Sequence, residues 1–290
     1  MTTPKTDISA ASPLDPGCRC CGGRVWHARR AFALAALGAA ALPALAQVNV
    51  GSASGMRNLV PAEQLEQSAV QQYDELLAQA KAQRALAPDN HPQLIKLRAI
   101  ARRIIPFTTQ WNPRAMQWRW QVNLIGSKEV NAFCMPGGKI AFYTGILDRL
   151  QLTDDEIAMV MGHEMAHALR EHARSRIAKS QATSLGLSLG AQLLGLGELG
   201  NMAANVGTQL LTLQFSRSDE SEADLVGLEL AARAGYNPQA AVSLWRKMGE
   251  VTGNGGIAFL STHPSGPDRI QELQQNVPRV EGLYQQARQR

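Results

Sequence analysis

The sequence predicts an α+β protein that is mainly α-helical and contains one small three-stranded sheet. Apolar residues recur at helical spacing through residues 61–105 and again beyond residue 153. Between these stretches, residues 116–144 contain short runs in which apolar and polar residues alternate, which is typical of strands with one buried face. The chain has 290 residues, of which 45% are apolar, and this excludes disorder throughout.

Residues 61–105 are predicted to form two helices. Pro61 opens the first, and a turn signal at residues 88–90 separates it from the second, which runs from about Pro92 to about Ile105. The apolar residues that define the two helices are Leu65, Val70, Tyr73, Leu76, Leu77, Leu94, Leu97, Ile100 and Ile104. Each helix thus has an apolar face for packing.

Three short strands are expected next. The first is indicated by apolar residues that alternate with polar ones, namely Trp118, Trp120, Val122 and Leu124. Residues 130–134 and 140–143 are the other two candidates, and the Met-Pro-Gly-Gly-Lys run of residues 135–139 joins them as a turn. These strands make up the predicted sheet.

The rest of the chain is predicted to be helical. Thr153 and Glu156 form a capping box, and one long helix is expected from there to about Lys179. Residues 183–215 are apolar and rich in glycine, which favours a helical hairpin that is buried or touches a membrane. Further helices are expected over residues 218–234, 237–250 and 268–275, with a loop at residues 262–264.

The N-terminal residues have the features of a secretory signal peptide. Arg29 and Arg30 precede an apolar run at residues 31–42, which is too short to span a bilayer, and residues 44–46 fit a cleavage site. The predicted divisions are a signal peptide over residues 1–46, a flexible segment over residues 47–60 and one domain over residues 61–290. The domain is therefore expected in the periplasm.

The charge and the cysteine content exclude some classes of protein. The chain carries a net charge of +5, but outside the first 46 residues there are 24 basic and 22 acidic side chains. This near balance excludes a nucleic-acid-binding protein on grounds of charge. Of the four cysteines, only Cys134 lies outside the predicted signal peptide, so no internal disulfide is expected. An exported domain of this kind must be held by its core or by a metal.

The decisive motif is the H-E-M-A-H run that begins at His163. On a helix, residues four apart face the same way, so His163 and His167 can reach one metal ion, with Glu164 beside the open position. The surrounding helix is largely apolar, and buried histidines need partners that a metal ion supplies. The sequence therefore predicts a zinc site. His172 lies about 140° round the same helix from His167 and is expected to be solvated.

A third ligand is expected downstream. Glu220 and Asp224 lie four residues apart on a predicted helix, so a ligating Glu220 could be followed by an Asp224 that accepts the other ring N–H of a ligating histidine. Glu222 projects elsewhere. Taken alone, the run is also typical of a solvated, acidic start of a helix, which the helix dipole favours. The H-E-M-A-H motif upstream favours the metal site.

Together, H-E-M-A-H and the E-S-E-A-D run of residues 220–224 resemble the gluzincin metallopeptidases of family M48, the group of HtpX and the CAAX prenyl endopeptidase. The resemblance covers about residues 61–275. Its other motifs are Asn131-Ala132-Phe133, Pro136-Gly137-Gly138, Gly145 and Thr262-His263-Pro264 with Arg269. The predicted signal peptide indicates the periplasmic branch that includes BepA and LoiP.

The resemblance implies a zincin-like fold and a ligand set. It implies one Zn²⁺ per chain, bound by His163, His167 and Glu220, with Asp224 behind the ligands.

It also implies roles in catalysis. Glu164 is the expected general base, and His263 either fills the fourth zinc position in a resting state or stabilises the oxyanion of the transition state. The strand with Asn131, Ala132 and Phe133 is expected to hold an extended substrate by strand addition.

The predicted function is that of an exported zinc metalloendopeptidase that cleaves envelope proteins, in protein quality control. Its partners are expected to be polypeptides, misfolded ones among them, with peripheral membrane contact through residues 183–215. One alternative is a chaperone-like periplasmic binding protein whose protease activity is latent because His263 blocks the metal. A membrane-embedded enzyme and a zinc hydrolase that does not act on peptides are further alternatives.

Overall fold

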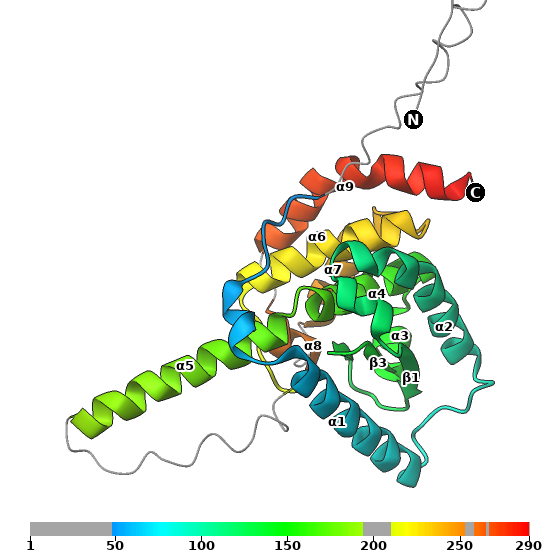
Figure 1. Ribbon diagram of the computed structural model, residues 1–290. Coiled ribbons are helices and arrows are strands. Elements are labelled where there is room, and N and C mark those ends of the chain that lie inside the picture. Colours follow the sequence, from blue (N-terminus) through cyan, green and yellow to red (C-terminus); the bar gives the residue numbers. More distant parts are fainter. Residues whose placement is uncertain (1–47, 194–209, 253–257, 265–266, 290) are drawn as a thin grey trace, which may run out of the picture. The chain divides into compact units, whose positions relative to one another are not determined.

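Helices cover both faces of a small sheet in the computed structural model, which describes residues 48–193, 210–252, 258–264 and 267–289 (Figure 1). The helices are α1 (Ala62–Ala82), α2 (Pro92–Ile104), α3 (Thr144–Leu150), α4 (Asp154–Leu169), α5 (His172–Leu193), α6 (Arg217–Arg233), α7 (Ala240–Thr252), α8 (Ala258–Thr262) and α9 (Pro267–Arg288). The 3₁₀-helices are η1 (Gly55–Leu59), η2 (Ile105–Gln110) and η3 (Pro113–Gln117). The strands are β1 (Gln121–Ile125), β2 (Ala132–Met135) and β3 (Lys139–Tyr143). The predicted α+β class is confirmed.

The sheet has the order β1-β3-β2, so β2 lies at an edge. β1 and β3 run parallel, whereas β2 and β3 form an antiparallel hairpin. Gly137 and Gly138 in its turn have φ angles of +81° and +76°, a left-handed conformation that glycine adopts without strain. A Cβ on Gly138 would lie 2.7 Å from the Trp120 ring. Both this contact and the positive φ angle therefore exclude larger residues at this position.

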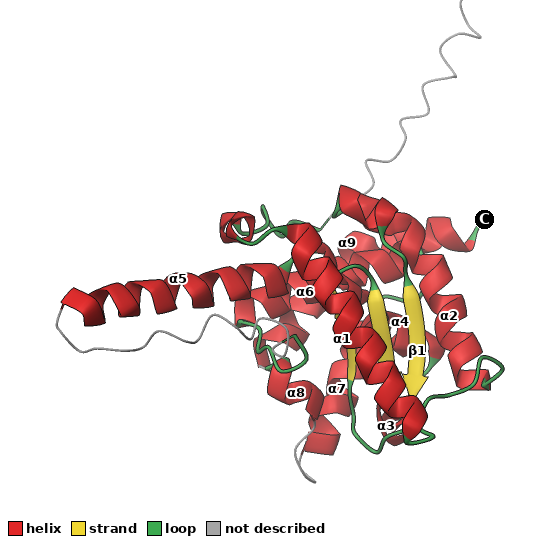
Figure 2. Cartoon of the chain, turned by 60° about the horizontal axis from the view of Figure 1, so that its bottom comes forward, coloured by secondary structure: helices red, strands yellow, loops and turns green. Residues whose placement is uncertain are grey.

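The two faces of the sheet pack against different helices. On one face, Ile125, Met135 and Ala141 contact α1 through Ala69 and Tyr73. Figure 2 shows α1 crossing this face. On the other face, alternate residues of the same strands join the main core with α2 and α4, as the two-residue period of a strand requires. The sheet thus supports α4 from one side.

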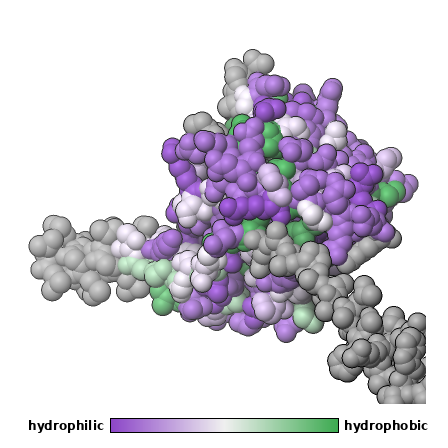
Figure 3. All heavy atoms as spheres, turned by 90° about the horizontal axis from the view of Figure 1, so that it is seen from above, coloured by the Kyte–Doolittle hydropathy of each residue, from purple (hydrophilic) through white to green (hydrophobic). Residues whose placement is uncertain are grey.

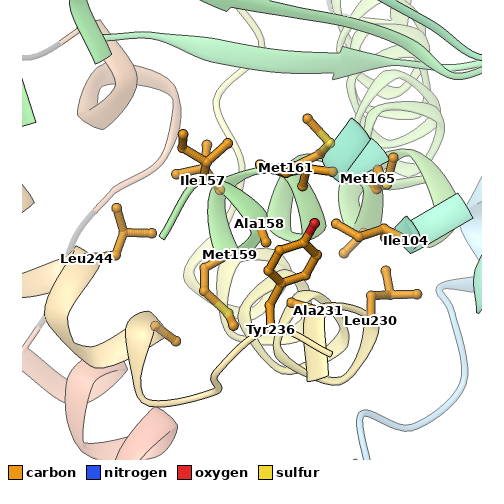
Figure 4. Close-up of a cluster of buried hydrophobic side chains, with 14 of the residues drawn as sticks. Ile104, Ile157, Ala158, Met159, Met161, Met165, Leu230, Ala231, Tyr236 and Leu244 are labelled. Carbon is orange, nitrogen blue, oxygen red and sulfur yellow. The ribbon is translucent and has the colours of Figure 1, made fainter. Parts of the chain in front are cut away.

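α6 supports α4 from the other side, at very close range. A Cβ built on Gly162 of α4 would lie 2.7 Å from the Gly227 carbonyl oxygen, and one on Gly227 of α6 would lie 2.6 Å from the His163 backbone nitrogen. Both positions therefore require glycine for the helices to approach. Around this crossing, apolar side chains from α2, α4, α6 and α7 form the core shown in Figure 4.

Two predicted elements differ from the structure. Trp118 and Trp120 precede β1, and their rings pack on each other with centroids 5.3 Å apart. Their alternation reflects this ring packing rather than a strand. The long helix predicted from Thr153 to about Lys179 is broken between Leu169 and His172, where Glu171 has a φ angle of +57°. Neither Gly nor Pro marks this break in the sequence.

The segment before α1 packs on the domain. Val48 is buried, and its backbone N–H donates to the fully buried Glu229 of α6 at 2.6 Å. Further along, Arg170 donates to the Gly51 carbonyl at 2.8 Å. These contacts lie in the segment predicted to be flexible, over residues 47–60, and they tie it to α6 and to the end of α4.

Of the Gly-rich segment, residues 183–215, the part over residues 194–209 lies outside the described residues, and residues 183–193 continue α5. Among those that the structure describes, no helix is both long and apolar enough to span a membrane. The face shown in Figure 3 is mainly hydrophilic, with scattered hydrophobic residues, over the described part of the chain.

Candidate active site

The H-E-M-A-H residues lie on α4, inside the domain. The helix begins with the predicted capping box. Thr153 Oγ1 accepts a hydrogen bond from the Glu156 backbone N–H at 3.3 Å, and the Glu156 carboxylate accepts one from the Thr153 backbone N–H at 2.8 Å. His163, Glu164 and His167 are each at most 4% exposed. With the sheet on one side and α6 on the other, their polar atoms must find partners within the protein.

α6 brings the acidic residues to the two histidines. A second capping box opens this helix, with Ser216 Oγ accepting from the Asp219 backbone N–H at 3.2 Å. Glu220 and Asp224 follow on one face of the helix, and Glu220 is fully buried. The close approach of α6 to α4 then directs both carboxylates toward the histidine rings.

Four donor groups converge on one point. The ligand atoms of His163, His167, Glu220 and His263 all lie within 4.8 Å of one another. The two Nε2 atoms of the histidines on α4 are 3.1 Å apart, and Glu220 oxygens lie 3.5 Å and 3.4 Å from them. Zn–N and Zn–O bonds near 2.1 Å place tetrahedral ligand atoms about 3.4 Å apart. The donor spacing and the donor types therefore fit a zinc ion.

His263 enters the site from the end of α8. Its ring stacks on Phe259, with centroids 4.4 Å apart and planes inclined by 19°. Its Nδ1 lies 3.1 Å from Glu220 Oε1 and 3.3 Å from His163 Nε2, while its Nε2 lies 3.6 Å from Glu164 Oε1. One ring thus faces both the donor cluster and the glutamate of the motif.

Asp224 lies directly behind His163. Its Oδ1 is 3.0 Å from His163 Nδ1, and Arg269 of α9 donates to both Asp224 oxygens at 2.6 Å and 2.8 Å. Arg269 also lies 2.8 Å from Glu220 Oε2 and over the Trp245 ring. A carboxylate held in this way fixes the ring orientation of His163 and aims its Nε2 at the cluster.

The two histidines of α4 have opposite pKa shifts in the metal-free protein. Burial acts to lower the pKa of His163, but hydrogen bonds to Asp224 and Glu220 outweigh it and raise the pKa to about 9. Burial lowers the pKa of His167 well below its usual value, and Glu220 only partly opposes this. Burial would raise the pKa of Glu220, but its hydrogen bonds to the histidines hold it far below the usual range. Glu220 is thus anionic within the donor cluster.

The prediction that His172 is solvated is wrong. The left-handed residue Glu171 ends α4 and starts α5 in a new direction, so the helical angle of an unbroken helix does not apply. His172 is 3% exposed, and its Nδ1 lies 2.9 Å from His167 Nδ1. Glu222 projects away from the donor cluster and pairs with Arg170 and His172.

A cleft runs beside the donor cluster. Its wall includes Glu164 and His167, and next to them the edge strand β2 contributes Phe133 and Cys134. Leu65 of α1 and Phe215, which stacks on His167 at 4.0 Å, complete a mostly apolar lining.

The predicted substrate strand meets this cleft in part. Phe133 lines it, Ala132 points into the main core, and Asn131 precedes β2. Leu65 and Phe215 were not predicted to line the site, because no motif marks them and only the fold brings them to the cleft.

Glu164 is suited to move a proton. Its Oε1 is buried and has no hydrogen-bond partner among the described residues. Burial raises the pKa of its carboxyl above the usual value, although His263 and His163 oppose the shift. A carboxylate of raised pKa, open to a cleft, can accept a proton from water and return it to a leaving group.

Comparison with known proteins gives a consistent result. The sequence pattern of Peptidase family M48 matches residues 95–277, which is more than half of the chain. The chain is 35% identical over 199 residues to the mitochondrial metalloendopeptidase OMA1 of Schizosaccharomyces pombe, with 68% of this chain and 56% of that protein covered.

Bacterial proteins are similar as well. The chain is 29% identical over 153 residues to the metalloprotease LoiP of Escherichia coli, with 52% of this chain and 60% of that protein covered. It is 26% identical over 157 residues to the metalloprotease YcaL of the same organism, with 52% and 59% covered. The chain spans about half the length of the curated relatives it matches. From the family match and the metal-ligand cluster together, we conclude that the chain belongs to peptidase family M48, whose members are metal-dependent.

Proposed function

We propose that the protein is a zinc-dependent endopeptidase that cleaves polypeptides in the bacterial envelope. The observation that carries the proposal is a cluster of four side chains that could bind a metal, at the wall of a cleft, beside a buried glutamate with one oxygen that makes no hydrogen bond among the described residues. Histidine and carboxylate donors at these distances suit zinc.

In this proposal His163, His167 and Glu220 hold one zinc ion, and Asp224 fixes the orientation of His163. A bound zinc ion supplies Lewis acidity, which polarises a peptide carbonyl and makes water easier to deprotonate. Glu164 takes the proton from the attacking water and passes it to the leaving amine. Its burial next to the ligands places it for both transfers.

The proposed substrates are extended polypeptide segments. Among the described strands, β2 has a neighbour on one side only, so its other edge can add a substrate strand through backbone hydrogen bonds, which do not select side chains. The apolar lining from Leu65, Phe133 and Phe215 then favours a large apolar side chain beside the scissile bond. Exposed apolar segments are typical of misfolded proteins, so the cleft suits a role in quality control.

The envelope location rests on the N-terminal sequence. The basic pair and apolar run within residues 1–46 are typical of a signal peptide, and residues 183–215 are the proposed point of peripheral membrane contact. Among the relatives, those named OMA1 are mitochondrial, whereas LoiP and YcaL are bacterial metalloproteases.

The proposal is tested by zinc content and casein cleavage of the wild type and of Glu164→Gln. We expect one zinc per chain in both, and a loss of cleavage of about 10³-fold or more in the variant, because the general base is removed while the ligands remain. Glu75→Gln, at an exposed position of α1, is the matched control and should cleave as the wild type does. Full activity of Glu164→Gln with zinc bound would overturn the assignment of the base.

A second candidate is a chaperone-like binding protein with latent protease activity. It is favoured by the position of His263, whose Nδ1 lies within the donor cluster and would occupy the fourth ligand position. His263→Ala should then increase casein cleavage, whereas a decrease would assign His263 to stabilisation of the oxyanion. Binding of an unfolded client by Glu164→Gln, at wild-type affinity, would support the binding function.

A further inference from the structure

His172 occupies a position that neither the motif nor the ligand set explains. It is buried, follows the helix break at Glu171, and its Nδ1 lies 2.9 Å from the Nδ1 of His167. Two ring nitrogens at this distance share one proton, with one ring donating and the other accepting. His172 therefore contacts His167 at the atom that faces away from the donor cluster.

The carboxylate of Glu222 lies behind His172. The Nε2 atom of His172 is 3.4 Å from Glu222 Oε2, at ion-pair distance, and Arg170 pairs with the other oxygen of Glu222. Arg170 is itself held by the carbonyl of Gly51 at 2.8 Å. Contacts therefore run in series from His167 to His172, then to Glu222 and Arg170. Arg170 is in turn held by the segment over residues 47–60, through Gly51.

The proton positions along this series of contacts follow from ligand chemistry. His167 Nε2 faces the other donors, and an imidazole nitrogen binds a metal ion only when it carries no proton. The proton of a neutral His167 ring is then on Nδ1, which donates to His172 Nδ1. The proton of His172 is in turn on Nε2, which lies 3.4 Å from Glu222 Oε2 but makes no hydrogen bond among the described residues.

We propose that His172, backed by Glu222, is a positioning residue that holds His167 in the orientation and tautomer needed to bind the metal. The proposal rests on the zinc site proposed above. In this proposal His172 fixes the ring orientation of His167 as Asp224 fixes that of His163, with an imidazole in place of a carboxylate. Because Glu220 and Glu222 both lie on α6, one short helical segment supplies a ligand and also supports the other ligands from behind.

Two substitutions at the same position separate positioning from packing. His172→Leu keeps an apolar volume but removes the acceptor, whereas His172→Asn keeps a short polar side chain whose oxygen can accept near the former Nδ1 position. Zinc affinity is measured by competition with a chromogenic chelator, and the visible spectrum of the cobalt-substituted protein reports ligand geometry. His91→Asn, at the start of α2, is the control outside the site.

We expect zinc affinity to fall about 10–100-fold in His172→Leu, with an altered cobalt spectrum, and to return to within about threefold of the wild type in His172→Asn. His91→Asn should match the wild type in both measurements. If His172→Leu is unfolded, Glu222→Gln provides the second test, and zinc affinity is expected to fall about tenfold, the lower end of the effect of a residue that supports a ligand.

Three results would overturn the proposal. One is wild-type zinc affinity in folded His172→Leu or, where that variant is unfolded, in Glu222→Gln. Another is a folded His172→Asn that binds zinc as weakly as His172→Leu, since the acceptor would then not be the cause. The third is a wild-type protein that binds no zinc, which would also overturn the proposed function, whereas the first two would leave that function standing.

Discussion

His163 and His167 are one helical turn apart on α4, yet they are held from behind in different ways. His163 meets the carboxylate of Asp224, which Arg269 grips with two hydrogen bonds. His167 meets the imidazole ring of His172, and the carboxylate of Glu222 lies one residue further back. Against the effect of burial, hydrogen bonds to Asp224 and Glu220 raise the pKa of His163 to about 9, whereas burial lowers the pKa of His167 well below its usual value.

The comparison teaches that two proposed ligands of the same type can be supported in different ways. A carboxylate behind an imidazole increases the electron donation of the ring to a metal, whereas a neutral acceptor mainly fixes its orientation. In the proposed site, Asp224 therefore places negative charge behind His163, whereas His172 mainly orients the ring of His167. The two carboxylates behind these histidines, Asp224 and Glu222, both lie on α6, so the packing of α6 on α4 affects both proposed ligands.

The largest effect is expected from Asp224→Asn. The substitution removes the negative charge that Arg269 and His163 share, and it leaves a buried arginine with a weaker partner. We expect zinc affinity to fall by about 100-fold. The free energy of unfolding of the metal-free protein should fall by about 3–5 kcal/mol. Chelator competition and urea unfolding measure the two effects.

Asp89→Asn is the matched control for this prediction. Asp89 is 89% exposed and pairs with Arg98 at the surface, so its loss should leave zinc affinity unchanged. Unaltered zinc affinity in Asp224→Asn would mean that charge behind His163 is unimportant, and the two histidines would then be equivalent.

An effect of similar type but smaller size is expected from Gly227→Ala. The added methyl group would lie 2.6 Å from the His163 backbone nitrogen, so α6 must move away from α4. We expect a loss of roughly 3 kcal/mol in the free energy of unfolding, together with weaker zinc binding, because both carboxylates move with α6. Urea unfolding of the metal-free protein measures the first effect.

Gly249→Ala, in α7, is the control for the helix crossing. No atom lies within 4 Å of a Cβ at that position, so the substitution should stabilise the protein by up to about 1 kcal/mol. If Gly227→Ala behaves in the same way as Gly249→Ala, the close approach of the helices is not required.

The mildest perturbation is a change of pH, which alters no residue and on which zinc affinity is expected to depend. The pKa of about 9 means that His163 is protonated at neutral pH, and zinc must displace that proton. Affinity should therefore rise with pH, by up to about tenfold per unit, and level off above about pH 9. The low pKa of His167 adds no step in this range. Chelator competition from pH 6.5 to 9 measures the slope.

The same pH series measured on Asp224→Asn tests whether the titrating group is His163. Without the carboxylate, the pKa of His163 should fall, so the rise in affinity should end at a lower pH than in the wild type. A slope that is the same in both proteins would show that the proton belongs to another group.

The sequence predicted the parts of the fold that local rules control. The capping box at Thr153 placed the start of α4, and Pro92 placed the start of α2 to within a residue. The H-E-M-A-H motif and the pair Glu220 and Asp224 were found because four-residue spacing defines one helix face before any tertiary contact is known. The structure brings these side chains together with His263.

The parts that could not be predicted depend on tertiary packing. Glu171 adopts a left-handed conformation that is unusual for its residue type, so nothing in the sequence indicated that α4 ends there and that His172 turns inward. Gly162 and Gly227 look like weak points of helices until the partner helix is known. The alternation around Trp118 followed the strand pattern but came from the packing of two indole rings.

The contact between Gly162 and Gly227 has a consequence for protein design. A metal cluster copied onto another pair of helices would carry over its four donors and their charged supports, but ordinary helices pack 8–10 Å apart. A methyl group at either glycine would collide with the facing backbone here, so this pair sits closer than side chains would allow. A scaffold intended to host the cluster therefore needs two glycines at the crossing, chosen before any ligand is placed.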